Sequence, residues 1–371
     1  MTINVLLFLG DEGPSPAEQW VMGGRVAALR DAVKLLAGIP SVTRLVIATP
    51  QRALAEQHPD LSVTWDFDPP GEPFHFGQRL SALLAAYPAD VSLYVGAGSL
   101  PLLPAETLAQ TLADVARSTK PLAITNNLYS SDWIGLNCPT AVQSRPERLE
   151  RDNALGWVLH NETGVEVRGL PASAATRLDI DTPADLALLS LLPRIGAELA
   201  GYLRAHPQTA ARSRWAAAAK VLFTPASQVM LLGRVASGVW SYVEARTRCW
   251  IRVFSEERGM AASGRQAAGL VRSLIGAHLA RVGPEAFFAD LSQMAEAVFF
   301  DTRVLLAHHH LWPSTADRYA SDLGLPEAIH DPFLREFTRA AINAPMPVVL
   351  GGHGVVAGDL YGVAEMGEQV E

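Results

Sequence analysis

The sequence of 371 residues has little cysteine, little charge and no long apolar run. Two cysteines, Cys138 and Cys249, are too few for a disulfide framework or a zinc site built from thiolates, which favours a reducing compartment. No stretch approaches the roughly 20 apolar residues that cross a bilayer. The apolar start of the chain also lacks the basic region of a secretion signal. We therefore expect a cytoplasmic protein that does not bind membranes.

Charged residues make up 18% of the chain and hydrophobic residues 49%, a composition too apolar for a disordered protein. The formal net charge of −8 disfavours binding to nucleic acid. At about 150 residues per domain, the length predicts two domains. A polar segment at 206–214 interrupts the hydrophobic pattern. We place a linker there, between domains at 1–205 and 215–371.

Short apolar runs alternate with helical patterns along the chain, which predicts an α/β protein with mostly parallel strands and flanking helices. The first domain has predicted strands at 5–9, 44–48, 62–65, 91–95, 121–125, 155–159 and 165–168. The second, helix-rich α/β domain has predicted strands at 229–232, 250–254, 304–307 and 347–350, with long helices at 265–281 and 284–300. Binding sites are expected where the parallel strands end.

The first strand leads into a predicted loop at 10–24 and then a helix at 25–36. Gly10 and Gly13 would let backbone N–H groups approach a nucleotide. Arg25, placed after Gly24 at the start of the helix, could hold a phosphate. An ordinary loop with a solvated arginine explains the same residues equally well.

The octet Asp-Ile-Asp-Thr-Pro-Ala-Asp-Leu at 179–186 predicts a helix start, with Thr182 as the N-cap and Pro183 as the first helical residue. Asp179 and Asp181 are two residues apart on an extended segment, so both side chains can face one Mg²⁺ ion. The acids of the octet also favour the N-terminal end of a helix without any metal.

These features, with the segments at 76–80 and 94–103, resemble the nucleotidyltransferase branch of the nucleotide-diphospho-sugar transferase (GT-A) fold over about the first 190 residues. The likeness is to the MobA-like molybdenum-cofactor guanylyltransferases and the phospholactate guanylyltransferases. It implies transfer of a nucleoside monophosphate from an NTP to a phosphorylated small-molecule acceptor, with release of pyrophosphate and with Mg²⁺ as cofactor. Catalysis would then be mainly positioning and charge neutralisation.

The resemblance also implies a set of site residues. Nucleotide binding falls to Gly10, Gly13, Gly24, Arg25, Gly96 and Ser99, the metal to Asp179 and Asp181, and the acceptor to Asn126, Asn127 and Asp132. The catalytic residues would be Arg25, Asp179 and Asp181. Asparagine at 126 and 127 is equally typical of turns.

Two positions support an alternative. In the family, an aspartate in a Gly-x-Asp-x-Pro segment binds the metal, whereas the matching position here is Ser99, or Gly98 if the alignment shifts by one residue. Asp11 and Glu12 lie where phosphates would bind. The alternative is a catalytically degenerate GT-A-like protein that binds a nucleotide-like ligand or a protein partner, with any activity in the second domain.

The second domain resembles no family that we recognise. Asp301, His308, His309 and His353 lie near predicted strand ends, where they could bind a metal or transfer protons if they converge. A glycine turn at 233–238 starts a helix but lacks the Gly-x-Gly-x-x-Gly spacing of a dinucleotide site. The apolar and aromatic residues of this domain suffice for a core and for a homodimer interface.

Overall fold

The computed structural model describes residues 1–367, which divide into two compact units. The first unit comprises Met1–Asp11, Gly23–Asp179 and Gly196–Leu199. The second comprises Glu12–Met22, Ile180–Ile195 and the described residues from Ala200 onward. This division differs from the predicted domains at 1–205 and 215–371. The predicted linker at 206–214 is largely helical, because helix α10 (Thr209–Leu222) begins inside it and is anchored by buried residues such as Trp215.

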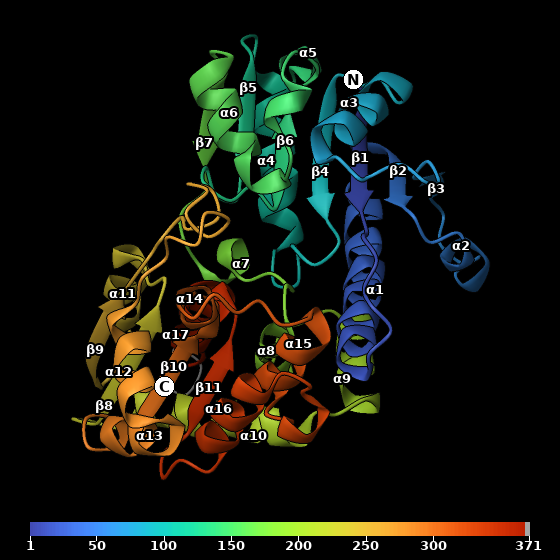
Figure 1. The fold of residues 1–371 in the computed structure, drawn as a ribbon. Helices are drawn as coiled ribbons and strands as arrows, with labels where there is room; N and C mark the ends of the chain where they lie inside the picture. The colour runs from blue at the N-terminus through green and yellow to red at the C-terminus, as the bar shows by residue number, and fades with distance from the viewer. Residues whose placement is uncertain (368–371) are drawn as a thin grey trace. The chain divides into compact units, whose positions relative to one another are not determined.

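A seven-stranded sheet in the order β3-β2-β1-β4-β6-β5-β7 forms the first unit (Figure 1). Only β6 runs antiparallel to its neighbours. The central strands β1 and β4 are buried along almost their whole length, which matches their continuous apolar sequences. The strands are β1 (Ile3–Phe8), β2 (Val42–Thr49), β3 (Thr64–Phe67), β4 (Val91–Gly96), β5 (Leu122–Thr125), β6 (Trp133–Leu136) and β7 (Glu166–Gly169).

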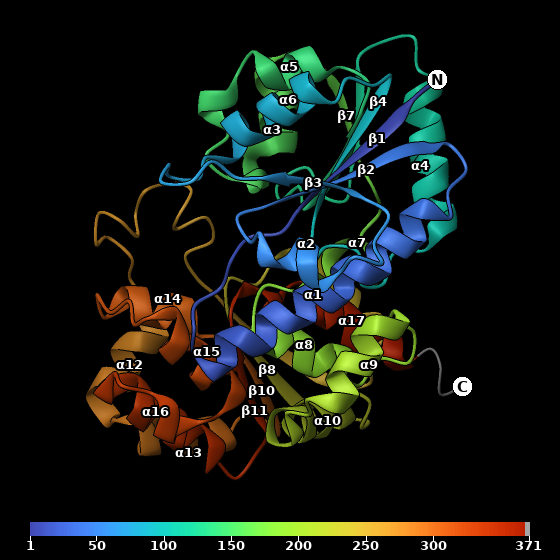
Figure 2. The same ribbon diagram turned by 90° about the vertical axis from the view of Figure 1, so that its right-hand side faces the viewer.

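Helices cover both faces of this sheet (Figure 2). On one face, α3 (Phe76–Ala86), α5 (Pro139–Gln143) and α6 (Leu155–Glu162) share an apolar core with Ile134 and Leu136 of β6. Side chains alternate along a strand, so Gly135 points to the opposite face, where it lies against α4 (Ala105–Arg117). The remaining short helices are α2 (Ala53–Gln57) and α7 (Ala174–Arg177).

Helix α1 extends over Pro16–Ala37, so the predicted loop up to residue 24 is wrong. Its start carries a reciprocal cap: Ser15 Oγ accepts from Glu18 N at 3.3 Å, and Glu18 Oε2 accepts from Ser15 N at 3.1 Å. Proline fits the first helical position. This cap establishes the helix upstream of the glycines at 23 and 24, whose cost of about 1 kcal/mol each does not end it.

The second unit contains a parallel four-stranded sheet in the order β11-β10-β8-β9. Its strands are β8 (Gln228–Gly233), β9 (Trp250–Ser255), β10 (Ala297–Asp301) and β11 (Val348–Gly351). Helices α12 (Leu274–Val282), α13 (Pro284–Ser292) and α16 (Pro332–Ile342) share one apolar core with β8, β10 and β11. On the other face, Trp215 of α10 packs against Phe299 of β10. The other helices are α8 (Pro183–Leu189), α9 (Ala197–Ala205), α11 (Ser237–Glu244), α14 (Thr302–His308), α15 (Thr315–Leu323) and α17 (Gly358–Met366).

The predicted fold class is confirmed: a mostly parallel sheet flanked by helices, followed by a helix-rich α/β unit. Four predicted elements are wrong in whole or in part. Residues 155–159 and 304–307 are helical rather than extended, and the end of the helix predicted at 284–300 is strand β10. The helix predicted at 265–281 begins only at Leu274, as α12. Short apolar runs suit a buried helix and a buried strand equally, so periodicity cannot separate them. None of the helices in residues 1–367 has the length and apolar character required to cross a bilayer.

Candidate functional site: a pocket where the parallel strands end

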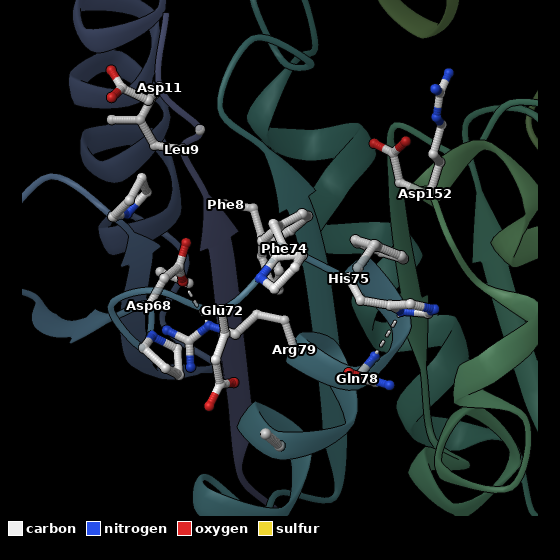
Figure 3. A pocket seen from close by; sticks show the side chains of 18 of the residues that line it. Phe8, Leu9, Asp11, Asp68, Glu72, Phe74, His75, Gln78, Arg79 and Asp152 are labelled. Atoms are coloured by element: carbon white, nitrogen blue, oxygen red, sulfur yellow. Dashed lines mark hydrogen bonds and ion pairs between the residues drawn. The ribbon is translucent and has the colours of Figure 1, made fainter.

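A pocket of about 1000 Å³ opens in the first unit at the carboxyl ends of β1 to β4 (Figure 3). The segment after β1, at 9–11, forms one wall, and the loop between β3 and α3, at 68–75, forms another. Four strands thus bring residues from distant parts of the sequence to one place. This is where an open α/β sheet places a ligand.

Aromatic side chains line much of this pocket. Tyr94 lies edge-on to Phe8 and Phe76, with ring centroids 5.2 and 4.9 Å apart. The ring centroids of Phe74 and Phe8 are 6.5 Å apart, yet the side chain of Phe74 is 60% exposed. Three prolines in the loop at 68–75 restrict the backbone that carries Phe74. An exposed ring on a stiff loop can stack on a flat ring system of a ligand.

Arg79 of α3 is held in the pocket wall by two carboxylates (Figure 3). Its Nε donates to Asp68 Oδ1 at 2.7 Å, and its Nη2 donates to Asp66 Oδ1 at 2.8 Å. Tyr87 also donates to Asp66, at 2.7 Å, and this hydrogen bond raises the pKa of Tyr87. Within residues 1–367, Nη1 of Arg79 has no partner, so it can bond to a ligand in a fixed direction.

The rim of the pocket is acidic. Five carboxylates line it, those of Asp11, Asp68, Glu72, Glu150 and Asp152, against three guanidinium groups. Two of the carboxylates have neutral donors, since Gln51 donates to Asp11 and Tyr94 donates to Asp152, at 2.7 and 2.8 Å. An excess of negative charge disfavours an anionic group of a ligand at this rim.

Two of the predicted nucleotide-binding residues, Gly10 and Gly96, line this pocket. A Cβ atom at Gly10 would meet no atom within 4 Å, so the backbone there is open to a ligand. Gly24, Arg25 and Ser99 do not line it, and Gly13 belongs to the second unit. Arg25 lies inside α1 and not at a helix start, so the predicted placement is wrong.

Ser99, one of the predicted nucleotide-binding residues, is part of the turn after β4. It is 6% exposed, and its Oγ donates to the carbonyl oxygen of Gly96 at 2.7 Å. The hydroxyl therefore stabilises the turn.

The predicted magnesium ligands, Asp179 and Asp181, fall in different units. Asp179 ends a segment of the first unit, and Asp181 belongs to the second. Thr182 caps α8 as predicted, with its N–H and that of Asp181 donating to Asp185 Oδ2 at 2.5 and 2.8 Å. In residues 1–367, no three His, Cys, Asp or Glu side chains gather where they could hold a metal ion.

The predicted acceptor residues form a closed network after β5. Asn126 is 2% exposed; its Nδ2 donates to Asp132 Oδ2 at 2.6 Å, and its Oδ1 accepts from Asp132 N at 3.0 Å. Asn127 Oδ1 accepts from Tyr129 N at 3.2 Å. The two amides order the loop between β5 and β6, as asparagine does in turns.

In the second unit, the four candidate residues have partners in two different groups. His308 and His309 end helix α14, where His308 Nδ1 accepts from Ser273 N at 3.1 Å and His309 packs on Phe333. Burial lowers the pKa of both histidines. Asp301 and His353 both contact Arg234 instead.

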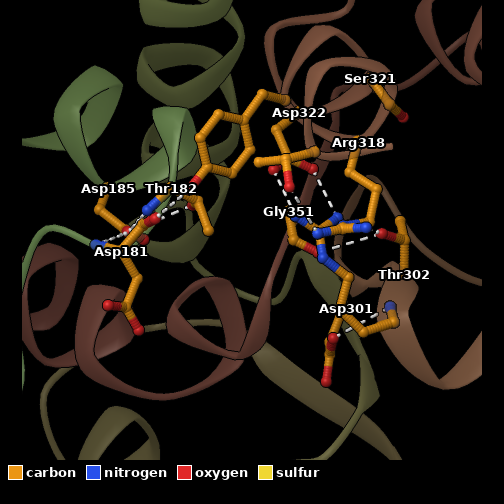
Figure 4. Close-up of polar contacts among 12 residues, drawn as sticks. Asp181, Thr182, Asp185, Asp301, Thr302, Arg318, Ser321, Asp322 and Gly351 are labelled. Carbon is orange, nitrogen blue, oxygen red and sulfur yellow. Dashed lines mark hydrogen bonds and ion pairs between the residues drawn. The ribbon is translucent and has the colours of Figure 1, made fainter. Parts of the chain in front are cut away.

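Beside Asp301, a buried ion pair joins the ends of two strands to α15 (Figure 4). Arg303 donates to both oxygens of Asp322, at 2.9 and 2.7 Å, and also to Thr302 Oγ1. Thr302 donates in turn to the carbonyl oxygen of Gly351 in β11. Both charged side chains are less than one-tenth exposed. The pair holds the sheet edge in place.

Sequence reasoning missed the residues that shape the pocket, above all Phe74 and Arg79. A signal was present, because a loop with three prolines and a glycine at 69–73 separates a strand from a helix. The partners of Arg79 could not be assigned, since Asp66 and Asp68 are two of many acids in the sequence.

Comparison with known proteins gives matches only among solved structures. No protein-family model matches the chain, and no curated protein does. The similar structures include a nucleotide-diphospho-sugar transferase from Desulfovibrio desulfuricans, with 18% identity, a TM-score of 0.42, and coverage of 57% of this chain and 97% of the other. A cytidylyltransferase from Leptospira borgpetersenii has 15% identity, a TM-score of 0.40, and coverage of 56% and 95%. A nucleotidyl transferase from Methanothermobacter has 14% identity, a TM-score of 0.40, and coverage of 55% and 99%.

Proposed function

We propose that the first unit is a nucleotidyltransferase whose pocket binds the nucleoside part of an NTP. The acceptor is a phosphorylated small molecule. One of its phosphate oxygens attacks the α-phosphorus, the bond between the α-phosphorus and the bridging oxygen breaks, and pyrophosphate leaves. The observation that carries the proposal is the pocket of about 1000 Å³ at the carboxyl ends of β1 to β4.

The lining of the pocket supports a nucleoside as ligand. Phe74 offers an exposed ring for stacking, and Nη1 of Arg79 offers a directed donor to a base or sugar oxygen. Gly10 allows close approach of the backbone. The acidic rim favours an orientation in which the phosphates lie outside the aromatic pocket. Magnesium enters this proposal as the ion that accompanies the nucleotide's phosphates.

A second candidate is a domain that binds a nucleotide without transferring it. It is favoured by Ser99, which matches the family's metal-binding aspartate in one of the two alignments and hydrogen-bonds within its own turn. The two candidates share the pocket and differ only in the chemistry that follows binding. The cytoplasmic location and the homodimer stay predictions from the sequence.

Pyrophosphate release separates the two candidates. The purified full chain is incubated with each of the four common NTPs, Mg²⁺ and a set of phosphorylated acceptors, including 2-phospholactate, phosphoenolpyruvate and sugar 1-phosphates. Transfer predicts pyrophosphate release that depends on one NTP and one acceptor and falls in Phe74→Ala. An NTP that binds with no release for any acceptor supports the binding domain. No binding of any NTP contradicts both.

A further inference from the structure

The two edges of the sheet in the second unit differ in how well they are covered. Strand β11 forms one edge, and all four of its residues are buried. Strand β9 forms the other edge (Figure 1), and four of its six residues are exposed. β9 pairs with β8 along its whole length. Its other side is therefore an open edge, to which a further strand can add.

The hydrogen bonds to β8 determine which backbone groups of β9 point to the open edge. Trp250 N and Glu256 N both donate to carbonyl oxygens on the β8 side, at 2.8 and 3.0 Å. Adjacent residues of a strand point their N–H and C=O groups to opposite sides, so the even-numbered residues of β9 bond to β8. The N–H and C=O groups of Ile251, Val253 and Ser255 therefore point to the open edge.

β9 lacks the features that keep an edge strand from pairing. Its sequence contains no proline, no lysine and no acidic residue, and its register with β8 has no shift that would mark a bulge. Trp250, Arg252 and Phe254 are alternate residues, so they lie on one face of the strand. The side chain of Trp250 is 64% exposed and that of Phe254 is 37% exposed. Exposed aromatic rings beside an open edge are typical of an interaction surface.

The sequence of β9 is complementary to itself when two copies pair antiparallel about a two-fold axis perpendicular to the sheet. With the axis at Val253, this residue lies opposite its own copy, and Ile251 lies opposite the partner's Ser255. The backbone groups that point to the open edge then exchange hydrogen bonds. Arg252 lies opposite the partner's Phe254 on the same face, where a guanidinium group can stack on the ring.

Two other registers of this pairing fit β9 less well. An axis at Arg252 would place the two Arg252 guanidinium groups opposite each other, and like charges in that position are destabilising. An axis at Ile251 would pair only residues 250–252 of each copy, because the strand begins at Trp250. The axis at Val253 pairs residues 251–255 and separates the two guanidinium groups. It is the register that the strand's length and its one charge favour.

We infer that β9 pairs with β9 of a second copy of this chain, antiparallel and centred on Val253. The two four-stranded sheets then form one continuous sheet. A two-fold axis repeats every contact, so both open edges are closed and both Arg252 side chains gain a ring. The occupant is a second copy because the one charged side chain of the strand finds its partner in the strand's own sequence. This surface lies in the second unit and does not depend on the function proposed for the first.

The molar mass of the purified full chain, measured by light scattering from about 1 to about 200 µM, tests the pairing. We expect twice the mass of one chain at the upper end. Val253→Pro removes an N–H group on the open edge and leaves the hydrogen bonds to β8 intact, a place where edge strands tolerate proline. It should weaken dimerisation by about tenfold or more. Val253→Thr keeps this N–H group and the branched shape, so as the matched control it should dimerise within about twofold of the unaltered chain.

Substitutions of Phe254 test the register with the backbone unchanged. Phe254→Arg places a cation opposite the partner's Arg252 and should weaken dimerisation by about fivefold or more. Phe254→Glu places a carboxylate there and should dimerise within about threefold of the unaltered chain. Thermal denaturation checks that each variant is folded. Three outcomes overturn the inference: a monomer up to the highest concentration, a dimer as tight in Val253→Pro as in the unaltered chain, and Phe254→Glu as weak as Phe254→Arg.

Discussion

The carboxyl groups of Asp185 and Asp359 are neighbours inside the second unit, and each acts on the ionisation of the other. They lie in the first turns of α8 and α17, and each is 1% exposed. Asp185 Oδ1 and Asp359 Oδ2 receive no protein donor. Two carboxylates this close cannot both be ionised, so they share a proton. Burial and the charge of Asp181 raise the pKa of Asp185 to about 7, and burial raises that of Asp359 well above its ordinary value.

This shared proton predicts how stability depends on pH. The folded state holds a proton that the unfolded chain loses near pH 3.8, so the free energy of unfolding should fall as the pH rises from about 4 to about 7. The fall from this group is on the order of 4 kcal/mol. Asp185→Asn keeps the shape without the charge, so its free energy of unfolding should fall less over this range. Urea denaturation at pH 5 and at pH 8 measures how much the free energy of unfolding falls between the two pH values. An equal fall in the unaltered chain and in Asp185→Asn would contradict the shared proton.

The ion pairs of Arg79 predict a stability effect in the first unit. Arg79→Met should lower the free energy of unfolding by about 2–4 kcal/mol, because it leaves Asp66 and Asp68 without their cation in a partly buried setting. Arg79→Lys should lower the free energy of unfolding by less, since lysine keeps the positive charge but lacks the planar set of N–H donors that binds both carboxylates. The control is Arg117→Gln, which removes an exposed pair with Asp114 and should change stability by less than about 1 kcal/mol. Equal effects of Arg79→Met and Arg117→Gln in urea denaturation would be inconsistent with this account.

Phe74 should affect binding and not stability. It is 60% exposed, so Phe74→Ala should shift the free energy of unfolding by no more than about 0.5 kcal/mol. Loss of a stacking ring should weaken nucleotide binding by at least about fivefold, since stacking on a base contributes about 1–3 kcal/mol. Tyr129→Ala, 74% exposed in the same unit and outside the pocket lining, is the matched control. Titration of both variants with the NTP that the unaltered chain binds measures the two affinities. Equal affinities of Phe74→Ala and Tyr129→Ala would show that Phe74 does not contact the nucleotide.

Gly233 should be intolerant of any side chain. It has a φ of +115°, and a Cβ atom there would lie 2.5 Å from Asp301 Cβ. Gly233→Ala should therefore cost about 2 kcal/mol or more in the free energy of unfolding. Gly71 has a φ of +81° but open space around it, so Gly71→Ala should cost only about 1 kcal/mol. Thermal or urea denaturation compares the two, and a smaller effect at Gly233 than at Gly71 would contradict the close approach.

Local signals made much of the fold predictable. The continuous apolar runs of β1 and β4 predicted buried parallel strands, and Thr182 and Pro183 predicted the start of α8. The start of α1 carried a comparable signal in Ser15, Pro16 and Glu18, which was missed. Strand β6 has only four residues and runs antiparallel, so no crossover pattern marked it.

The sequence predicted residues of the candidate site only where the course of the backbone, and not a side-chain contact, determines their position. Gly10 and Gly96 line the pocket because they lie at or just after the carboxyl ends of the adjacent strands β1 and β4. The places of Arg79 and of His308 depend on partners distant in sequence, at Asp68 and Ser273, and no spacing reveals such pairs. The strand predicted before His308 is helix α14, with Asp301 as its N-cap.

The most direct test of the central claim is a thermal-shift panel with GTP, CTP, ATP and UTP, each with and without Mg²⁺. A ligand at about 100 times its Kd adds roughly 2.7 kcal/mol to the free energy of unfolding if it binds only the folded chain. The account predicts a rise in Tm with one of the four NTPs that is reduced in Phe74→Ala and unchanged in Tyr129→Ala. No rise with any NTP, or a rise that Phe74→Ala leaves intact, would contradict nucleotide binding in the pocket of the first unit.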